Sequence, residues 1–269
     1  MEEAGSGITK DFEDRFDMNI PVLLLMAIFL ISLVLTMVGL GGGLVFSPLF
    51  VILGMPKAEA ASASLFLNLI AAGAAAYTYS RKKLVDFSLS IPLILSSSLT
   101  APIGSYLNVR LDLKPFLVIM AVVLAMAGAR MLISPQREEE GSAIESSLKI
   151  LAGIVVGACI GLMGGLLGIG GGVFIVPLLI YVLKTPTKIA AASSTFIVCF
   201  SSLTGFLGYA SMAKINWWFI LPAAAASFAG GQVGARIMSN RMKGKSIRII
   251  FSMILFLLCV KLLQQSFYP

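Results

Sequence analysis

The chain contains one ten-residue pattern twice. Residues 39–48 read GLGGGLVFSP and residues 168–177 read GIGGGVFIVP. Both copies lie inside long apolar stretches. Consecutive glycines end a helix readily, because each costs up to ~1 kcal/mol in a helix relative to alanine. Any fold of this chain must therefore accommodate two interruptions within its apolar segments.

The similarity extends well beyond the glycines. The two copies are offset by 129 residues at the glycines and by 130 residues after a one-residue insertion, and the match holds over about 65 residues. Matched pairs after the insertion include Pro56 with Pro186, Tyr79 with Tyr209, Pro92 with Pro222 and Gly104 with Gly234. This is an internal duplication, a construction that many transporter folds share.

Composition places the duplicated chain in a membrane. Of the 269 residues, 58% are apolar and 12% are charged, whereas soluble domains carry roughly 25% charged residues. Apolar runs recur along the whole chain, which predicts a multi-pass integral protein of the cell membrane. The net charge of +7 favours basic loops facing anionic lipid. We expect a small anionic substrate and membrane lipid as partners and no nucleic acid, and we leave homo-oligomerisation open.

The predicted fold is an all-α polytopic membrane protein. Residues 1–19 form a polar N-terminal tail, either an interfacial helix or a disordered segment; residues 20–133 form the first repeat, 134–147 an acidic linker and 148–269 the second repeat. The expected helical segments are 20–38, 44–54, 59–80, 88–108, 114–133, 148–167, 173–183, 189–210, 216–238 and 247–265.

Charge distinguishes two topologies. If each glycine-broken segment crosses the membrane once, the repeats are parallel and the 20 lysines and arginines divide evenly between the two sides. If each broken segment is a hairpin or pair of half-helices, three further transmembrane helices follow and the repeats are inverted. One side then holds thirteen of the 20. Because basic residues favour the cytoplasm, we predict inverted repeats with both termini outside.

The motifs resemble those of a known family. Each glycine triplet is followed by a proline and then by an Ala- and Ser-rich segment: GLGGGLVFSPL with PKAEAASASLF, and GIGGGVFIVPL with PTKIAAASSTF. This doubled pattern resembles the sulfite exporter TauE/SafE family of membrane transporters, and the resemblance covers nearly the whole chain after residue 20. It implies transport of small anions, often sulfur-containing ones such as sulfite or sulfonates.

The glycines are the first candidate binding residues. A break at Gly41, Gly42 and Gly43, and again at Gly170, Gly171 and Gly172, would leave free N–H groups at the start of each following half-helix. Helix N-termini carry partial positive charge and bind anions. We expect Pro48 and Pro177 to begin the returning helices, because proline is tolerated in a first turn. The alternative is that the glycines only allow close helix packing.

Hydroxyl and amide side chains form a second candidate set. In the first repeat they are Ser62, Ser64 and Asn68; in the second they are Ser193, Ser194 and Thr195. Hydroxyls and amides can donate hydrogen bonds to an oxyanion. The alternative is that they bond across helices as packing contacts.

A stripe of small residues follows the linker. Gly153, Gly157, Gly161 and Gly165 recur every four residues. This spacing places them on one helix face and is typical of a close helix–helix contact in membranes. We therefore predict a packing role for the stripe.

The residue types exclude several functions. With no histidine and three scattered cysteines, we predict no metal site, no cofactor and no enzymatic nucleophile–base pair. Every Asp and Glu lies in the tail, a loop or a segment end, so a proton relay within the membrane is poorly supplied. Export or facilitated exchange is favoured on this basis. A passive anion channel and proton-coupled uptake of an organic anion remain the alternatives.

Overall fold

The computed structural model describes residues 22–108, 114–133, 146–167, 172–210 and 216–267. The described residues form helices and no strands, so the predicted all-α class is confirmed for this part of the chain. The helices are α2 (Val22–Val38), α3 (Gly43–Ile52), α4 (Lys57–Arg81), α5 (Phe87–Asn108), α6 (Lys114–Ile133), α7 (Ser146–Leu167), α8 (Gly172–Tyr181), α9 (Thr187–Ala210), α10 (Trp217–Arg241) and α11 (Gly244–Phe267). Each helix end lies within three residues of its predicted position.

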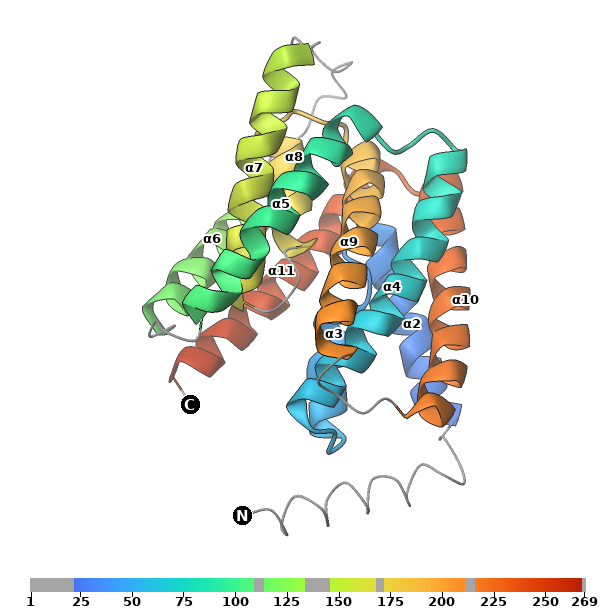
Figure 1. Ribbon diagram of the computed structural model, residues 1–269. Coiled ribbons are helices and arrows are strands. Elements are labelled where there is room, and N and C mark those ends of the chain that lie inside the picture. Colours follow the sequence, from blue (N-terminus) through green and yellow to red (C-terminus); the bar gives the residue numbers. More distant parts are fainter. Residues whose placement is uncertain (1–21, 109–113, 134–145, 168–171, 211–215, 268–269) are drawn as a thin grey trace.

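The helices of the two halves interleave. Helices α4 and α9 lie side by side near the centre, α5 packs along α7, α10 along α2, and α6 along α11 (Figure 1). In the duplicated sequence α5 corresponds to α10 and α7 to α2. Each of these two contacts therefore joins a helix of one half to a helix of the other, and neither half buries its helices alone.

The short helices reverse the direction of the chain. Helix α3 runs back toward the end of the bundle at which α2 begins, and α8 runs back toward the end at which α7 begins (Figure 1). These two ends lie on opposite sides of the bundle. The starts of α3 and α8 consequently point toward its interior from opposite directions.

Glycine ends α2 by a specific hydrogen-bond pattern. Gly39 has a φ of +89°, and the N–H of Leu40 donates to the carbonyl of Leu35 at 2.9 Å. This is the bonding of a Schellman motif, which satisfies carbonyls that the helix end leaves free. The buried hydroxyl of Tyr79 donates to the carbonyl of Thr36 at 2.9 Å and supports the same last turn.

The prolines do not begin the returning helices. Pro48 lies inside α3 and Pro177 inside α8, each five residues after the first helical residue. The preceding helix α2 ends at Val38, before the glycines, and α3 starts at the last glycine of the triplet, Gly43. Proline at this depth removes one hydrogen bond. Our placement of Pro48 and Pro177 at the helix starts was therefore wrong.

The glycine stripe packs closely, as predicted, at Gly157 and Gly161, whereas Gly153 makes an ordinary contact and the surroundings of Gly165 lie outside the described part of the structure. A methyl group added at Gly157 would collide with the backbone of Leu93 at 2.8 Å, and one at Gly161 would meet the Cα of Ser97 at 2.7 Å, both in α5. On the α10–α2 contact the small residues lie on the other helix: Gly230 and Gly234 of α10 approach the α2 backbone in the same way. The small residues thus lie on α7 in one contact and on α10, the counterpart of α5, in the other, which explains why the stripe of α7 has no counterpart in α2.

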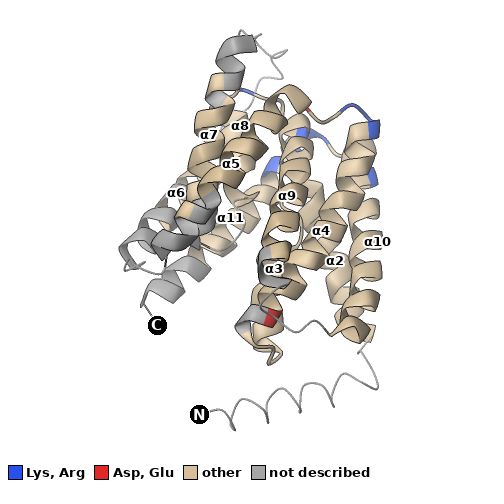
Figure 2. Cartoon of the chain, in the orientation of Figure 1, with Lys and Arg blue, Asp and Glu red and all other residues tan. Residues whose placement is uncertain are grey.

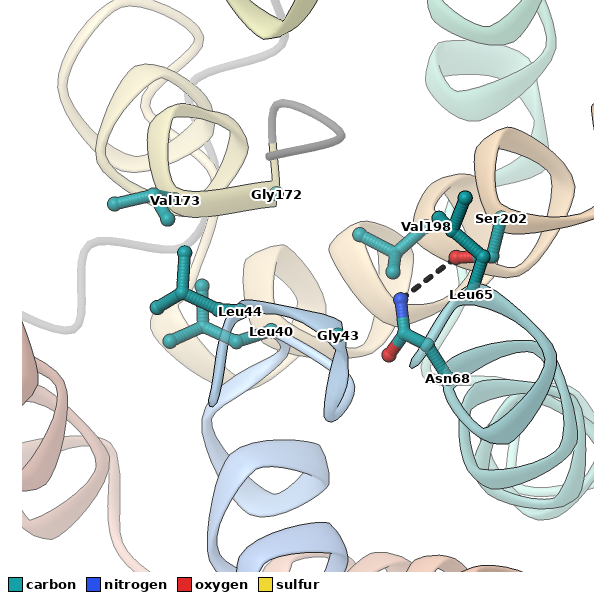
Figure 3. Close-up of a pocket in the computed structure, with 9 residues that line it drawn as sticks. All are labelled: Leu40, Gly43, Leu44, Leu65, Asn68, Gly172, Val173, Val198 and Ser202. Carbon is teal, nitrogen blue, oxygen red and sulfur yellow. Dashed lines mark hydrogen bonds between the residues drawn. The ribbon is translucent and has the colours of Figure 1, made fainter. Parts of the chain in front are cut away.

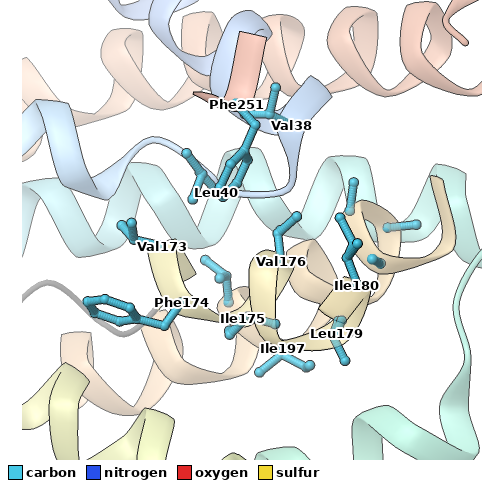
Figure 4. Packing of buried hydrophobic residues seen from close by; sticks show 14 of the residues in the cluster. Val38, Leu40, Val173, Phe174, Ile175, Val176, Leu179, Ile180, Ile197 and Phe251 are labelled. Atoms are coloured by element: carbon cyan, nitrogen blue, oxygen red, sulfur yellow. The ribbon is translucent and has the colours of Figure 1, made fainter. Parts of the chain in front are cut away.

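Two buried apolar clusters hold the short helices. Phe46 and Phe50 of α3 pack with Phe219 of α10. Around α8, Val173, Val176 and Ile180 join a larger cluster that includes Leu40 of the glycine break (Figure 4). Both short helices are thus held by residues far away in sequence.

Charged residues are distributed unevenly along the bundle. The described Lys and Arg residues gather at the end of the bundle where α4 ends and α9 begins (Figure 2). Among the described residues, two helical segments are long and apolar enough to cross a membrane by length and composition: Glu59–Arg81 and Thr187–Leu207.

Candidate functional site

A small, largely enclosed cavity lies where the two short helices begin. Its volume of about 30 Å³ is enough for a water molecule or two, by the measure that one water needs roughly 10–15 Å³. It is bounded by the first residues of α3 and α8 and by the middle of α4 and α9 (Figure 3). The lining residues are Leu40, Gly43, Leu44, Leu65, Asn68, Gly172, Val173, Val198 and Ser202.

Asn68 is the polar centre of this cavity. Its side-chain oxygen accepts a hydrogen bond from the backbone N–H of Gly42. Its side-chain nitrogen donates to the hydroxyl of Ser202 at 2.6 Å (Figure 3). The amide is almost fully buried, with 5% of its surface exposed. Asn68 therefore links the glycine break of the first half to α9 of the second half.

The start of α3 keeps free donors beside Asn68. The carbonyl of Gly42 accepts the first helical bonds, from the N–H groups of Val45 and Phe46. The N–H groups of Gly43 and Leu44 have no hydrogen-bond partner among the described residues, as expected for the first turn of a helix. Both residues line the cavity. The positive end of the helix dipole is thus directed at the cavity from this side.

Two of the predicted hydroxyls bond to the chain at the first glycine break. The hydroxyl of Ser64 donates to the carbonyl of Gly43 at 2.8 Å. The hydroxyl of Ser194 donates to the carbonyl of Gly39 at 2.6 Å, although Ser194 belongs to the second half. These matched serines support the break from α4 and from α9.

Neither these two serines nor the other three candidate hydroxyls line the cavity. Ser193 accepts a bond from the N–H of Asp86 at 3.0 Å, which ties α9 to the loop before α5. Thr195 donates to the carbonyl of Ala191 within its own helix at 2.9 Å. The hydroxyl of Ser62 is buried without a partner among the described residues.

The candidate glycines divide into three groups. Gly41, Gly42 and Gly43 are described, and a methyl group at Gly41 or Gly43 would press against the Asn68 side chain. Gly172 begins α8, where an added methyl would lie 2.9 Å from Val198 and 3.6 Å from the Leu40 carbonyl. Gly170 and Gly171 lie outside the described residues.

Sequence reasoning missed Ser202 and the apolar lining. Ser202 is not matched to Asn68 by the duplication, since its counterpart is Ala72. A usable signal was its position four residues after Val198 and eight after Ser194, on the same face of α9. The apolar side chains Leu65 and Val198 carried no signal, because they look like any other helix residue in this chain.

None of the residues that line the cavity is titratable. Among the described residues there is also no group of His, Cys, Asp and Glu that could hold a metal ion. Chemistry at the cavity therefore rests on N–H, hydroxyl and amide groups. Such groups suit the binding of an oxyanion by hydrogen bonds.

The fold and the cavity together define a class. An apolar helical bundle, with two short helices beginning at one enclosed cavity, has the architecture of a helical membrane transporter. The chain belongs to the sulfite exporter TauE/SafE family, whose model matches residues 24–262. Family membership agrees with the predicted membrane character and transport role, and it indicates a transporter rather than an enzyme.

Curated relatives carry matching descriptions. Probable membrane transporter protein YunE of Bacillus subtilis (strain 168) is 24% identical over 256 residues, which cover 87% of this chain and 93% of the relative. A probable membrane transporter protein of Xylella fastidiosa (strain 9a5c) is 26% identical over 251 residues, covering 88% and 92%. No solved structure matches the chain.

Proposed function

We propose that the protein transports small anions, and specifically sulfur-containing oxyanions or organosulfonates of the sulfite type. One observation carries the proposal: the first residues of α3 and α8, Gly43 and Gly172, line the same cavity. Two helix N-termini that meet at one site add their partial positive charges there. This arrangement suits a bound anion.

We propose further that the two halves are inverted repeats working by alternating access. The opposite directions of the α2–α3 and α7–α8 pairs support this (Figure 1). So does the enrichment of Lys and Arg at one end of the bundle (Figure 2), which would face the cytoplasm. Opening of the cavity toward one end and then the other would move the anion across.

The cavity favours a carrier over a passive channel. Leu40, Leu44 and Val198 narrow it to about 30 Å³, so an anion could enter only after the helices move. Without a titratable group in its lining, the site itself supplies no proton coupling. An inside-negative potential favours anion efflux by ~2.3 kcal/mol per charge per 100 mV. We therefore propose export or facilitated exchange.

Flux into liposomes that contain the purified protein tests this function. Uptake of radiolabelled sulfite should saturate with concentration, compete with sulfonates and respond to an imposed potential. Non-saturable flux would assign the protein to the channels. Proton-driven accumulation would assign it to coupled uptake, and no flux of any tested anion would contradict the proposal.

A further inference from the structure

An open groove lies at the basic end of the bundle, well away from the cavity. It has a volume of about 380 Å³ and runs between the last turns of α4 and of α10. Its cationic side chains are Arg81, Lys82 and Arg236, beside Tyr77, Gln232 and Asn240. The groove combines positive charge with hydrogen-bonding groups on a surface that transport through the central cavity does not use.

The positive charge of the groove is not neutralised. None of its three cations pairs with a carboxylate of a described residue. Lys82 donates to the hydroxyl of Ser239 at 2.9 Å and to the side-chain oxygen of Asn240. The guanidinium of Arg236 has no side-chain partner within the described part of the chain. Its donors are therefore available to an anion.

The floor of the groove is held in place. The hydroxyl of Thr78 donates to the side-chain oxygen of Gln232 at 2.9 Å, and the Gln232 nitrogen donates to the carbonyl of Ala74 at 3.1 Å. On the rim, the Arg81 guanidinium lies 5.8 Å from the centre of the Tyr77 ring. The two hydrogen bonds of Gln232 join α4 to α10 beneath the cations.

The groove is not part of the duplicated pattern. The counterparts of Tyr77 and Arg81 are Leu207 and Ser211, and the counterparts of Gln232 and Arg236 are Pro102 and Tyr106. A role shared by both halves would require similar residues in both. The matched positions hold neither the two arginines nor the glutamine, so the groove lacks a two-fold counterpart and is distinct from the two-fold transport site.

An apolar face of α10 leads up to the groove. Leu221 and Phe228, seven residues apart and so on one side of the helix, are exposed along it, at 59% and 50%. In a membrane protein such a face contacts lipid chains, and the basic end above it lies at the level of the headgroups. A lipid beside α10 would therefore bring its headgroup to the groove.

We propose that this groove binds the phosphate group of an anionic lipid headgroup. Guanidinium groups match phosphate with two parallel hydrogen bonds, and basic pockets at the cytoplasmic ends of membrane helices bind anionic headgroups. Free phosphate offers the same chemistry from the soluble phase, so the experiment compares the two sources.

The test uses the full-length protein in micelles that contain phosphatidylcholine, with phosphatidylglycerol or inorganic phosphate added. Bound lipid is counted by mass spectrometry of the intact complex, and melting temperature is measured alongside. In the R81Q/R236Q variant, the preference for phosphatidylglycerol over phosphatidylcholine should fall about fivefold for each cation removed. The control R241Q/K245Q removes the same charge from exposed residues at the same end and should keep the preference.

Each outcome of this experiment either supports or overturns the proposal. A preference that only R81Q/R236Q loses assigns the groove to a lipid phosphate. A rise in melting temperature with inorganic phosphate, lost in R81Q/R236Q and without lipid preference, assigns it to soluble phosphate. Equal losses in both variants, or a wild-type protein that responds to neither source, would overturn the proposal.

Discussion

The side-chain oxygen of Asn68 in α4 accepts a hydrogen bond from the backbone N–H of Gly42, the residue directly before α3. In this arrangement the protein's own amide occupies one of the donors that a helix N-terminus offers to an anion. The next two N–H groups, of Gly43 and Leu44, border the cavity. Asn68 thus fixes the break while leaving the neighbouring donors free.

Replacing Asn68 by Asp tests the charge of the proposed site. Asp keeps an acceptor for the Gly42 N–H, loses the donor to Ser202, and places a carboxylate against the cavity. We expect Asn68→Asp to abolish binding of sulfite, because like charges repel strongly in a buried site. Melting-temperature shifts with sulfite measure this. Asn68→Ala, as the matched uncharged variant, should bind more sulfite than Asn68→Asp; the reverse order would exclude an anion at the cavity.

The glycines of the first break should differ in their tolerance of alanine. Gly41 has a φ of +67° and faces the Asn68 oxygen, so Gly41→Ala should destabilise the fold by at least about 1–2 kcal/mol from the left-handed backbone alone. In Gly43→Ala the added methyl group would contact only the Asn68 side chain, at 3.1 Å. This variant should fold but transport less. Thermal melting and liposome flux check both effects.

The control for the glycine series is Gly73→Ala in α4. An added methyl there lies 3.6 Å from the Cys199 sulfur, an ordinary contact. It should raise helix stability by up to ~1 kcal/mol and leave flux unchanged. Normal transport by both Gly41→Ala and Gly43→Ala would exclude the break from the site.

Ser194 and Thr195 are neighbours with different expected effects. Ser194→Ala removes the donor to the buried carbonyl of Gly39, which should cost about 1–3 kcal/mol of stability. Thr195→Val removes a bond within its own helix and should cost much less. Denaturation of the two variants in detergent compares them; an equal loss would mean that the bond from Ser194 to Gly39 contributes nothing.

Cysteine labelling tests the inverted topology. In a variant whose native cysteines are replaced by alanine, Ile52→Cys at the end of α3 should react with an impermeant reagent in intact cells. Lys83→Cys, at the opposite end after α4, should react only once the cells are opened. Both residues are exposed on the protein surface. Labelling of both from outside would contradict the proposed orientation.

Much of the fold follows from the sequence alone. Apolar runs determine the helices, because a chain in lipid can form few other structures. Consecutive glycines determine the break before α3, because glycine destabilises a helix more than any other residue except proline. The doubled motif was enough to indicate the family. These are local properties of the chain, and neighbours in sequence determine them.

The tertiary structure decided which candidate residues meet. Asn68 and Ser202 are 134 residues apart, and Ser194 and Gly39 are 155 apart; no local pattern joins them. Ser193 and Thr195 share the residue type and region of Ser194 but bond elsewhere, because a helix turns each successive side chain by about 100°. Sequence determined where the helices end, and the packing of α4 against α9 decided which polar groups surround the cavity.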